Sequence, residues 1–166
     1  LDLQAAQIER ARTLATERGL VNVRFEIGDA YDLPFPDATF DAVYAHTLLA
    51  HLHEPMRALR EMHRVLRPGG VAGVADIDTD TIIVAPPLPE VVAGLDLFRR
   101  VRAHRRGRAN DGRERRGQLR ATGFDEVIGE AFLLVAGTPE ATRRTARGMG
   151  ALLQAPDDAA LAVEQG

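Results

Sequence analysis

Apolar residues along the chain follow two spacings, one typical of helices and one typical of strands. Residues 3–18 place apolar side chains near one face and charged ones on the other, which predicts a helix that ends near Gly19. Residues 22–27 alternate polar and apolar side chains, as a strand with one buried face does. The short apolar runs at 41–45 and 71–75 predict strands that are buried on both faces.

Helical spacing dominates the rest of the chain. A helix is predicted to open at Glu54-Pro55 and to stop at Pro68-Gly69-Gly70, because proline suits a first turn and glycine commonly follows a helix end. Further elements are predicted as helices over 89–106, 113–122 and 139–153 and as a strand within 124–136. Strands that alternate with helices indicate an α/β domain with a mostly parallel sheet.

Polar groups follow the predicted strands at their carboxyl ends, where ligands of open parallel sheets bind. An adenosine-type cofactor needs a carboxylate that grips both ribose hydroxyls, a second carboxylate that accepts from the adenine amine, and apolar side chains around the ring. Asp2 with Leu3, and Asp29 with Ala30, offer this set. Asp29 taken alone also suits a simple turn after a strand.

Composition removes several classes of function. The chain has no cysteine, which excludes disulfides and thiolate metal sites, and no lysine, which excludes Schiff-base chemistry. The net charge of -3 disfavours a dedicated nucleic-acid binder. No apolar run reaches the ~20 residues of a membrane span, and the first residues lack the layout of a signal peptide. The cytoplasm is therefore the expected compartment.

Two motifs give the chain a family resemblance. They are Leu33-Pro34-Phe35-Pro36-Asp37-Ala38-Thr39-Phe40-Asp41 and Arg64-Val65-Leu66-Arg67-Pro68-Gly69-Gly70. Together with the segments around Asp2 and Asp29, they resemble the class I S-adenosylmethionine (AdoMet)-dependent methyltransferases, in particular the type 11 or ubiquinone/menaquinone-biosynthesis-like subgroup. The resemblance is close over residues 1–76 and looser through Phe124.

The resemblance implies roles for individual residues and a missing segment. Asp2 would bind the ribose of AdoMet and Leu3 would pack on the adenine, while Asp29 would contact the adenine amine. The backbone amide of Ala30 would contact the ring. The family's glycine-rich loop lies ~20 residues before the ribose-binding acid, which would place it before Leu1. The chain is therefore expected to be a truncated methyltransferase that lacks this loop, the first strand, most of the second strand and the last strand.

The expected fold is an incomplete Rossmann-like class I methyltransferase sheet of the α/β class, with helices on both faces. Residues 1–136 are interpreted as a partial methyltransferase domain, within which residues 77–111 form a lid on the acceptor side. Residues 137–166 are interpreted as a C-terminal helical segment and tail of the same domain.

Four of the five histidines lie close together, at His46, His51, His53 and His63. A metal site is one interpretation, but no carboxylate lies at a convincing ligand spacing, so no metal is predicted. His46 is expected to line the cofactor pocket. His51 is expected near the methyl acceptor, as a general base or an acceptor contact, because histidine titrates near neutral pH.

Ten of the 21 arginines lie between Arg99 and Arg120. They predict either a surface for RNA or an anionic substrate, or a solvated helix face, and the absence of interleaved aromatic residues favours the helix face. Asp76, Asp78 and Asp80 follow a predicted strand and suggest either a cation site or the wall of an acceptor pocket.

The predicted function is methyl transfer from AdoMet to a small-molecule acceptor. The reaction needs alignment of donor and acceptor and exclusion of water rather than a metal or a covalent intermediate. Two alternatives remain at this point, namely a non-catalytic binding module that uses the same fold, and a nucleic-acid methyltransferase steered by the arginine cluster.

Overall fold

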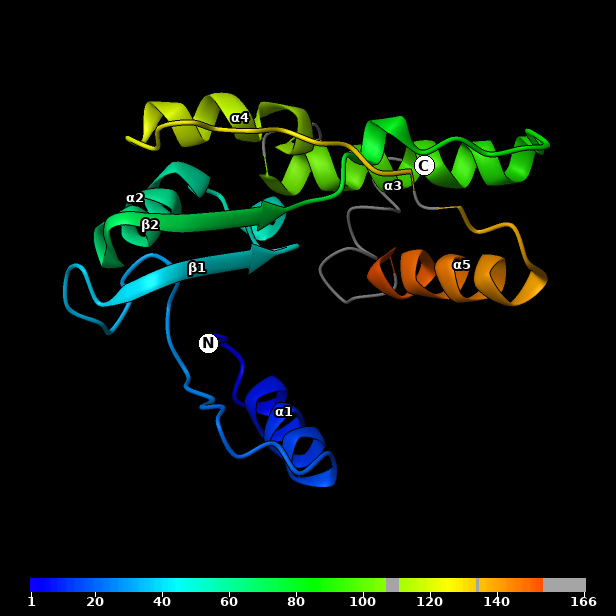
Figure 1. Ribbon diagram of the computed structural model, residues 1–166. Helices are drawn as coiled ribbons and strands as arrows, with labels where there is room; N and C mark the ends of the chain where they lie inside the picture. The colour runs from blue at the N-terminus through cyan, green and yellow to red at the C-terminus, as the bar shows by residue number, and fades with distance from the viewer. Residues whose placement is uncertain (107–110, 134, 154–166) are drawn as a thin grey trace. The chain divides into compact units, whose positions relative to one another are not determined.

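Helices and a small parallel sheet make up the described part of the chain (Figure 1). The computed structural model describes residues 1–106, 111–133 and 135–153. The order of elements is α1 (Ala5–Glu17), β1 (Phe40–His46), η1 (Leu49–His51), α2 (Pro55–Val65), β2 (Leu66–Ala75), η2 (Thr79–Thr81), α3 (Pro89–Arg106), α4 (Asp111–Ala121) and α5 (Pro139–Leu153).

The chain forms two compact units, each made of several segments. The first unit comprises residues 1–49, 54–75 and 117–127. The second comprises residues 50–53 and the described parts of 76–116 and 128–166. The first unit holds α1, the sheet and α2, and the second holds α3 and α5.

β1 and β2 pair in parallel and run side by side (Figure 1). Ala42 is level with Val71 and His46 with Ala75, so the carboxyl ends of both strands meet at one edge of the sheet. β2 begins at Leu66, five residues before the predicted start, and it includes Pro68-Gly69-Gly70. The prediction that these three residues stop the preceding helix is therefore wrong, because the helix ends at Val65 and Leu66 is already extended.

α2 packs against β2 and supplies the core of the first unit. Its buried side chains recur at the spacing of one helical face, and they are Ala58, Leu59, Met62 and Val65. Leu59 is fully shielded from solvent. Leu66, which follows Val65 and begins β2, is also buried. The helix begins at Pro55, as predicted, because proline lacks the amide hydrogen that a first turn leaves unpaired.

Two predicted strands are absent from the described residues. Residues 22–27 form only an isolated parallel bridge, between Asp2 and Ile27. Residues 124–133 and 135–136 contain no strand either, and Phe132 is 83% exposed. An alternating pattern makes a strand only where a partner supplies a ladder of hydrogen bonds, and these segments have no such ladder in the described part of the chain.

The remaining helices agree with their sequence patterns. α3 and α5 have the predicted bounds, and α4 begins two residues earlier than predicted. In the second unit, Leu95, Phe98 and Val101 of α3 are buried. Over the described residues, no helix is both long and apolar enough to cross a membrane. The predicted tail within 137–166 lies outside the described residues from 154 onward.

Candidate functional site

Backbone hydrogen bonds bring Asp2 beside the segment that carries Asp29. The Asp2 amide donates to the Glu26 carbonyl at 3.2 Å, and the Gly28 amide donates to the Asp2 carbonyl at 3.0 Å. The Leu1 side chain packs closely over Gly28, where a Cβ atom would lie 2.5 Å from Leu1 Cδ1. The two aspartates that the sequence predicts as cofactor ligands therefore belong to one local arrangement.

The two carboxylates each have one oxygen engaged by a neighbouring backbone amide. Asp2 Oδ1 accepts from the Gln4 amide at 2.8 Å, and Asp29 Oδ1 accepts from the Tyr31 amide at 2.8 Å. Each bond fixes a turn and orients its carboxylate. Both residues are exposed, and within the described part of the chain neither Oδ2 has a partner. Each carboxylate can thus accept a hydrogen bond from a hydroxyl or an amine of a ligand.

Apolar groups follow both aspartates. The Leu3 side chain is 70% exposed, and Ala30 is half-buried. An exposed leucine next to an exposed carboxylate offers a ligand both an apolar surface and a hydrogen-bond acceptor.

His46 is the last residue of β1, at the carboxyl edge of the sheet. Its ring stacks on Tyr44 with 6.3 Å between centroids, and its Nδ1 lies 3.3 Å from Thr47 Oγ1. Thr47 takes a positive φ of 51°, and its amide donates to the Ala75 carbonyl at 2.7 Å. His51 lies in η1, is exposed, and belongs to the second unit. None of the hydrogen bonds described for His46 joins it to Asp2 or Asp29.

The aspartates that follow β2 contact arginines of α4. Asp76 Oδ2 accepts from Arg115 Nε at 2.6 Å. Asp78 accepts from Arg113 through both oxygens, at 2.7 Å from Nε and 3.1 Å from Nη2. Arg113 holds the pKa of Asp78 below its ordinary value. These carboxylates are occupied by guanidinium groups, and the described residues contain no cluster that fits a metal ion.

Several members of the arginine cluster have intramolecular partners. Arg99 donates from Nε to the Thr79 carbonyl at 3.3 Å, and from Nη2 to the carbonyls of Asp80 and Ile82 at 3.2 Å. With Arg113 and Arg115, it organises the segment that follows β2. These three charges are therefore committed to the fold of the second unit rather than to an anionic ligand.

A polar stripe along α2 went unnoticed in the sequence. Its members recur every three or four residues, and they are Glu54, Arg57, Glu61 and Arg64. The stripe contacts residues 31–37, which include the first part of the first motif. The helical spacing of acids and arginines beside the apolar face is the signal that would have revealed it.

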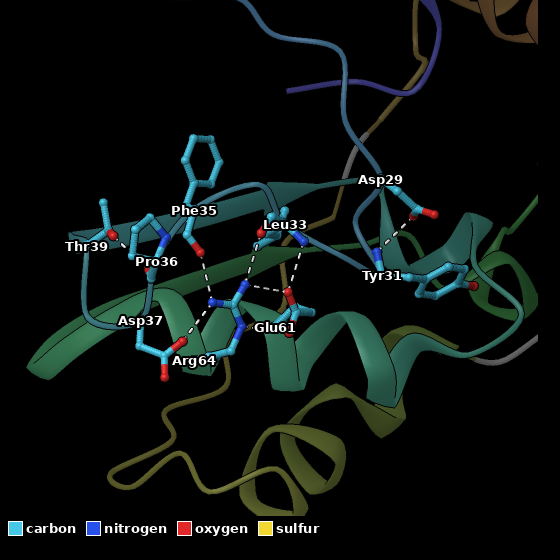
Figure 2. A network of polar contacts seen from close by, with 9 residues as sticks. All are labelled: Asp29, Tyr31, Leu33, Phe35, Pro36, Asp37, Thr39, Glu61 and Arg64. Atoms are coloured by element: carbon cyan, nitrogen blue, oxygen red, sulfur yellow. Dashed lines mark hydrogen bonds and ion pairs between the residues drawn. The ribbon is translucent and has the colours of Figure 1, made fainter.

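Arg64 and Glu61 form what we call the α2 clasp (Figure 2). Arg64 donates from Nη1 to the Phe35 carbonyl and to Asp37, both at 2.8 Å, and from Nη2 to the Leu33 carbonyl at 3.0 Å. Its Nε and Nη2 bind both oxygens of Glu61 at 2.8 and 2.7 Å. The Leu33 amide donates to Glu61 Oε2 at 2.9 Å. The hydrogen bond from Arg64 lowers the pKa of Glu61 more than burial raises it.

Further hydrogen bonds and an ion pair join the two sequence motifs. The Ala38 amide donates to the Arg64 carbonyl at 3.0 Å, and the Thr39 amide donates to the Val65 carbonyl at 2.8 Å. Arg67 pairs with Asp41 across the two strands. The first motif and the second motif are thus bound to each other through both backbone and side chains.

Comparison with known proteins bears on the part of the chain that carries both motifs. Residues 1–74 match the family described as a methyltransferase domain. This match covers a little less than half of the chain. The match contains Asp2, Asp29, the α2 clasp and nearly all of β2.

Individual relatives agree with this family. The O-methyltransferase resE of Aspergillus sclerotiorum is 35% identical over 127 residues, 75% of this chain and 44% of its own length. A demethylmenaquinone methyltransferase of Listeria monocytogenes is 43% identical over 79 residues, 48% of this chain and 32% of its own length. The chain thus spans less than half the length of these curated methyltransferases.

The fold agrees as well. The crystal structure of the YcgJ protein of Bacillus subtilis matches 95% of this chain and 68% of its own chain, with a TM-score of 0.60 and 26% identity. A putative methyltransferase of Bacillus halodurans matches 74% of this chain and 51% of its own, with a TM-score of 0.57 and 25% identity. The predicted Rossmann-like methyltransferase fold is confirmed, with a sheet of two strands in the described residues.

Proposed function

We propose that this chain is part of an enzyme that transfers a methyl group from AdoMet to a small-molecule acceptor. Asp2, Leu3, Asp29 and Ala30 bind the adenosine part of AdoMet, and His46 lines the same pocket. The observation that carries the proposal is the pairing of Asp2 with residues 26–28, which puts two exposed carboxylates in one arrangement within the matched methyltransferase residues.

The chemistry of the two carboxylates fits an adenosine. Each keeps its Oδ2 without a partner among the described residues, so each can accept one further hydrogen bond from a ligand. Asp2 accepts from ribose hydroxyls and Asp29 from the exocyclic amine of adenine. The exposed Leu3 side chain provides an apolar surface for the adenine ring.

The residues assigned to the cofactor bind and orient it rather than react. When bound, AdoMet supplies a methyl group on a sulfonium, which is a good leaving group. Rate enhancement then comes chiefly from holding the acceptor in line and from excluding water. In the second unit, residues 77–111, of which 107–110 lie outside the described residues, are assigned to acceptor binding, and His51 of that unit contacts the acceptor or takes its proton. The match to an O-methyltransferase supports a small oxygen-containing acceptor.

The nucleic-acid alternative has less support than the small-molecule one. Arg99, Arg113 and Arg115 bind carbonyls or carboxylates of their own unit. An arginine that is already hydrogen-bonded within its own unit does not offer its charge to a phosphate without breaking those bonds.

Titration of the ¹⁵N-labelled chain with S-adenosylhomocysteine, followed by amide chemical shifts, tests the proposal. We expect shifts concentrated at Asp2, Leu3, Asp29 and Ala30. Inosine at the same concentration is the control, because it lacks the exocyclic amine that would donate a hydrogen bond to Asp29. Shifts that are absent at these four amides, or equal for both ligands, would overturn the assignment. Methylation assays on acceptors then separate an enzyme from a binding module.

A further inference from the structure

The segment that carries Asp29 and Ala30 depends on α2 for its conformation. Residues 33–38 contain no helix or strand, so their backbone groups need partners elsewhere. Arg64 provides donors for the carbonyls of Leu33 and Phe35, and Glu61 provides an acceptor for the Leu33 amide. Two side chains of one helix therefore satisfy three polar backbone groups of this loop (Figure 2).

A second contact ties the turn itself to the same helix. The Glu54 amide donates to the Tyr31 hydroxyl at 3.0 Å, and the Arg57 guanidinium lies 5.1 Å from the centroid of the Tyr31 ring. The Tyr31 amide in turn donates a hydrogen bond to Asp29 Oδ1. A set of contacts thus runs from the start of α2 through Tyr31 to the Asp29 carboxylate, and Leu33, which the clasp holds, follows Tyr31 by two residues in the chain.

We propose that Glu61 and Arg64 are positioning residues of the adenine-binding turn. They touch no ligand. They hold residues 33–37 against α2 and thereby keep Asp29 and Ala30 in the conformation that binds adenine. This inference rests on the proposed function, because it assigns the clasp to that same cofactor site.

The geometry explains why arginine and glutamate are both needed. The planar guanidinium of Arg64 reaches five acceptor atoms on four residues, which an ammonium group does not match. Both oxygens of Glu61 are used, Oε1 by Arg64 and Oε2 by Arg64 and the Leu33 amide. A glutamine at this position has one oxygen and presents a donor where an acceptor is needed.

The experiment compares Arg64→Met with Arg60→Met in the full chain. Arg60 lies on the same helix and is exposed, and no contact of its side chain is described, so both variants make the same change in helix propensity. Amide hydrogen exchange at Tyr31 and Leu33 reports the loop, and a titration with S-adenosylhomocysteine reports binding. Amides of the β1–β2 ladder report whether the fold is intact.

We expect Arg64→Met to accelerate exchange at Tyr31 and Leu33 while the β1–β2 amides stay protected. If the turn is then competent for about 10–30% of the time, the apparent Kd rises about three- to tenfold. Arg60→Met should change neither quantity. Glu61→Gln is the second variant and is used if Arg64→Met fails to fold. It should likewise accelerate exchange at Tyr31 and Leu33 and raise the apparent Kd.

The outcomes separate this inference from the proposed function. A wild-type chain that shows no shifts at Asp2 and Asp29 would overturn the proposed function. A wild-type chain that binds, with an Arg64→Met variant that loosens the loop at unchanged Kd, would overturn the positioning role alone. Equal effects of Arg60→Met and Arg64→Met would do the same.

Discussion

Arg115 of α4 and Asp76, the residue after β2, form a buried ion pair. Arg115 Nε lies 2.6 Å from Asp76 Oδ2, and only 8% and 1% of the two side chains are exposed. A pair removed from water in this way holds α4 against the segment that follows the sheet. The aspartate that the sequence suggested as a ligand at the strand end has a structural partner instead.

Removing either partner of this pair should destabilise the second unit. We expect Asp76→Ala or Arg115→Met to cost about 3–5 kcal/mol of unfolding free energy, because the remaining charge stays buried without its counter-ion. Urea unfolding measures the loss. Arg116→Met is the control, since Arg116 is exposed on the same helix and its removal should cost little.

The double variant Asp76→Ala with Arg115→Met should lose less stability than the sum of the two single changes. It removes both charges and leaves none unpaired, so its stability should lie near that of the better single variant. Strictly additive losses would show that the two side chains act independently, contrary to the pair described here.

The glycines of the second motif have different tasks, which substitution should separate. Gly69 takes a φ of +78°, so Gly69→Ala should cost about 1–2 kcal/mol, while Gly69→Asn should cost less because asparagine tolerates this conformation. A Cβ atom at Gly70 would lie 2.9 Å from the Arg67 carbonyl oxygen and 3.1 Å from that of Asp41. Gly70→Ala should therefore cost about 1–3 kcal/mol. Because asparagine also carries a Cβ atom, Gly70→Asn should not be milder, in contrast to position 69.

Gly117→Ala in α4 provides the control for these glycine variants. A Cβ atom there meets nothing within 4 Å, and the position is helical, so the change should stabilise by about 1 kcal/mol. Thermal unfolding compares the set. A Gly70→Ala variant as stable as wild type would contradict the close approach of the two strands at this point.

The second motif also shows how far sequence patterns carried the fold. The family resemblance was confirmed, and so was the position of β1 to within one residue. Gly69 and Gly70 were interpreted as a helix stop, but the helix ends at Val65 and both glycines lie within β2. A glycine that follows a helix and one that permits a close strand contact look identical in a single sequence, because the difference lies in the facing Asp41 carbonyl.

Long-range polar contacts set the other limit on prediction. The apolar face of α2 was evident from its period, yet the partners of Glu61 and Arg64 lie about thirty residues earlier in the chain. Asp76 and Asp78 were left open between a cation site and a pocket wall, because their partners on α4 follow 39 and 35 residues later. The roles of Asp2, Leu3, Asp29, Ala30, His46 and His51 stay predictions.

The α2 clasp should open in acid. Its arginine lowers the folded pKa of Glu61 below the ordinary value of 4.5, so the folded state holds fewer protons than the unfolded state in this range. The stabilisation is therefore complete above about pH 5 and is lost as the pH falls through the folded pKa. The nearby charges are Arg57 and Arg64 on α2 and Asp37 on the loop.

The Leu33 amide shift, followed from about pH 6 to pH 2.5, measures this opening. We expect a midpoint below 4.5, and Glu61→Gln should abolish the transition. Asp78 titrates in the same direction because of Arg113, and the Asp80 amide, which donates to Asp78, reports that event separately. A midpoint at or above 4.5 for Leu33 would show that Arg64 does not hold Glu61 in solution.

The two aspartates of the proposed cofactor site should discriminate different parts of one ligand. Asp2→Asn keeps an oxygen for the Gln4 amide but removes the charge that would bind ribose, so it should reduce the preference for adenosine over 2′-deoxyadenosine. Asp29→Asn should instead reduce the preference for adenosine over inosine. Each change should reduce the affected affinity ratio about tenfold, as expected for a hydrogen bond to a charged group.

Asp32→Asn is the control, because Asp32 is an exposed acid in the same segment and its replacement should alter neither ratio. Titrations of all three variants with the three nucleosides measure the ratios, and an exchange of the two specificities would reverse the roles assigned to Asp2 and Asp29.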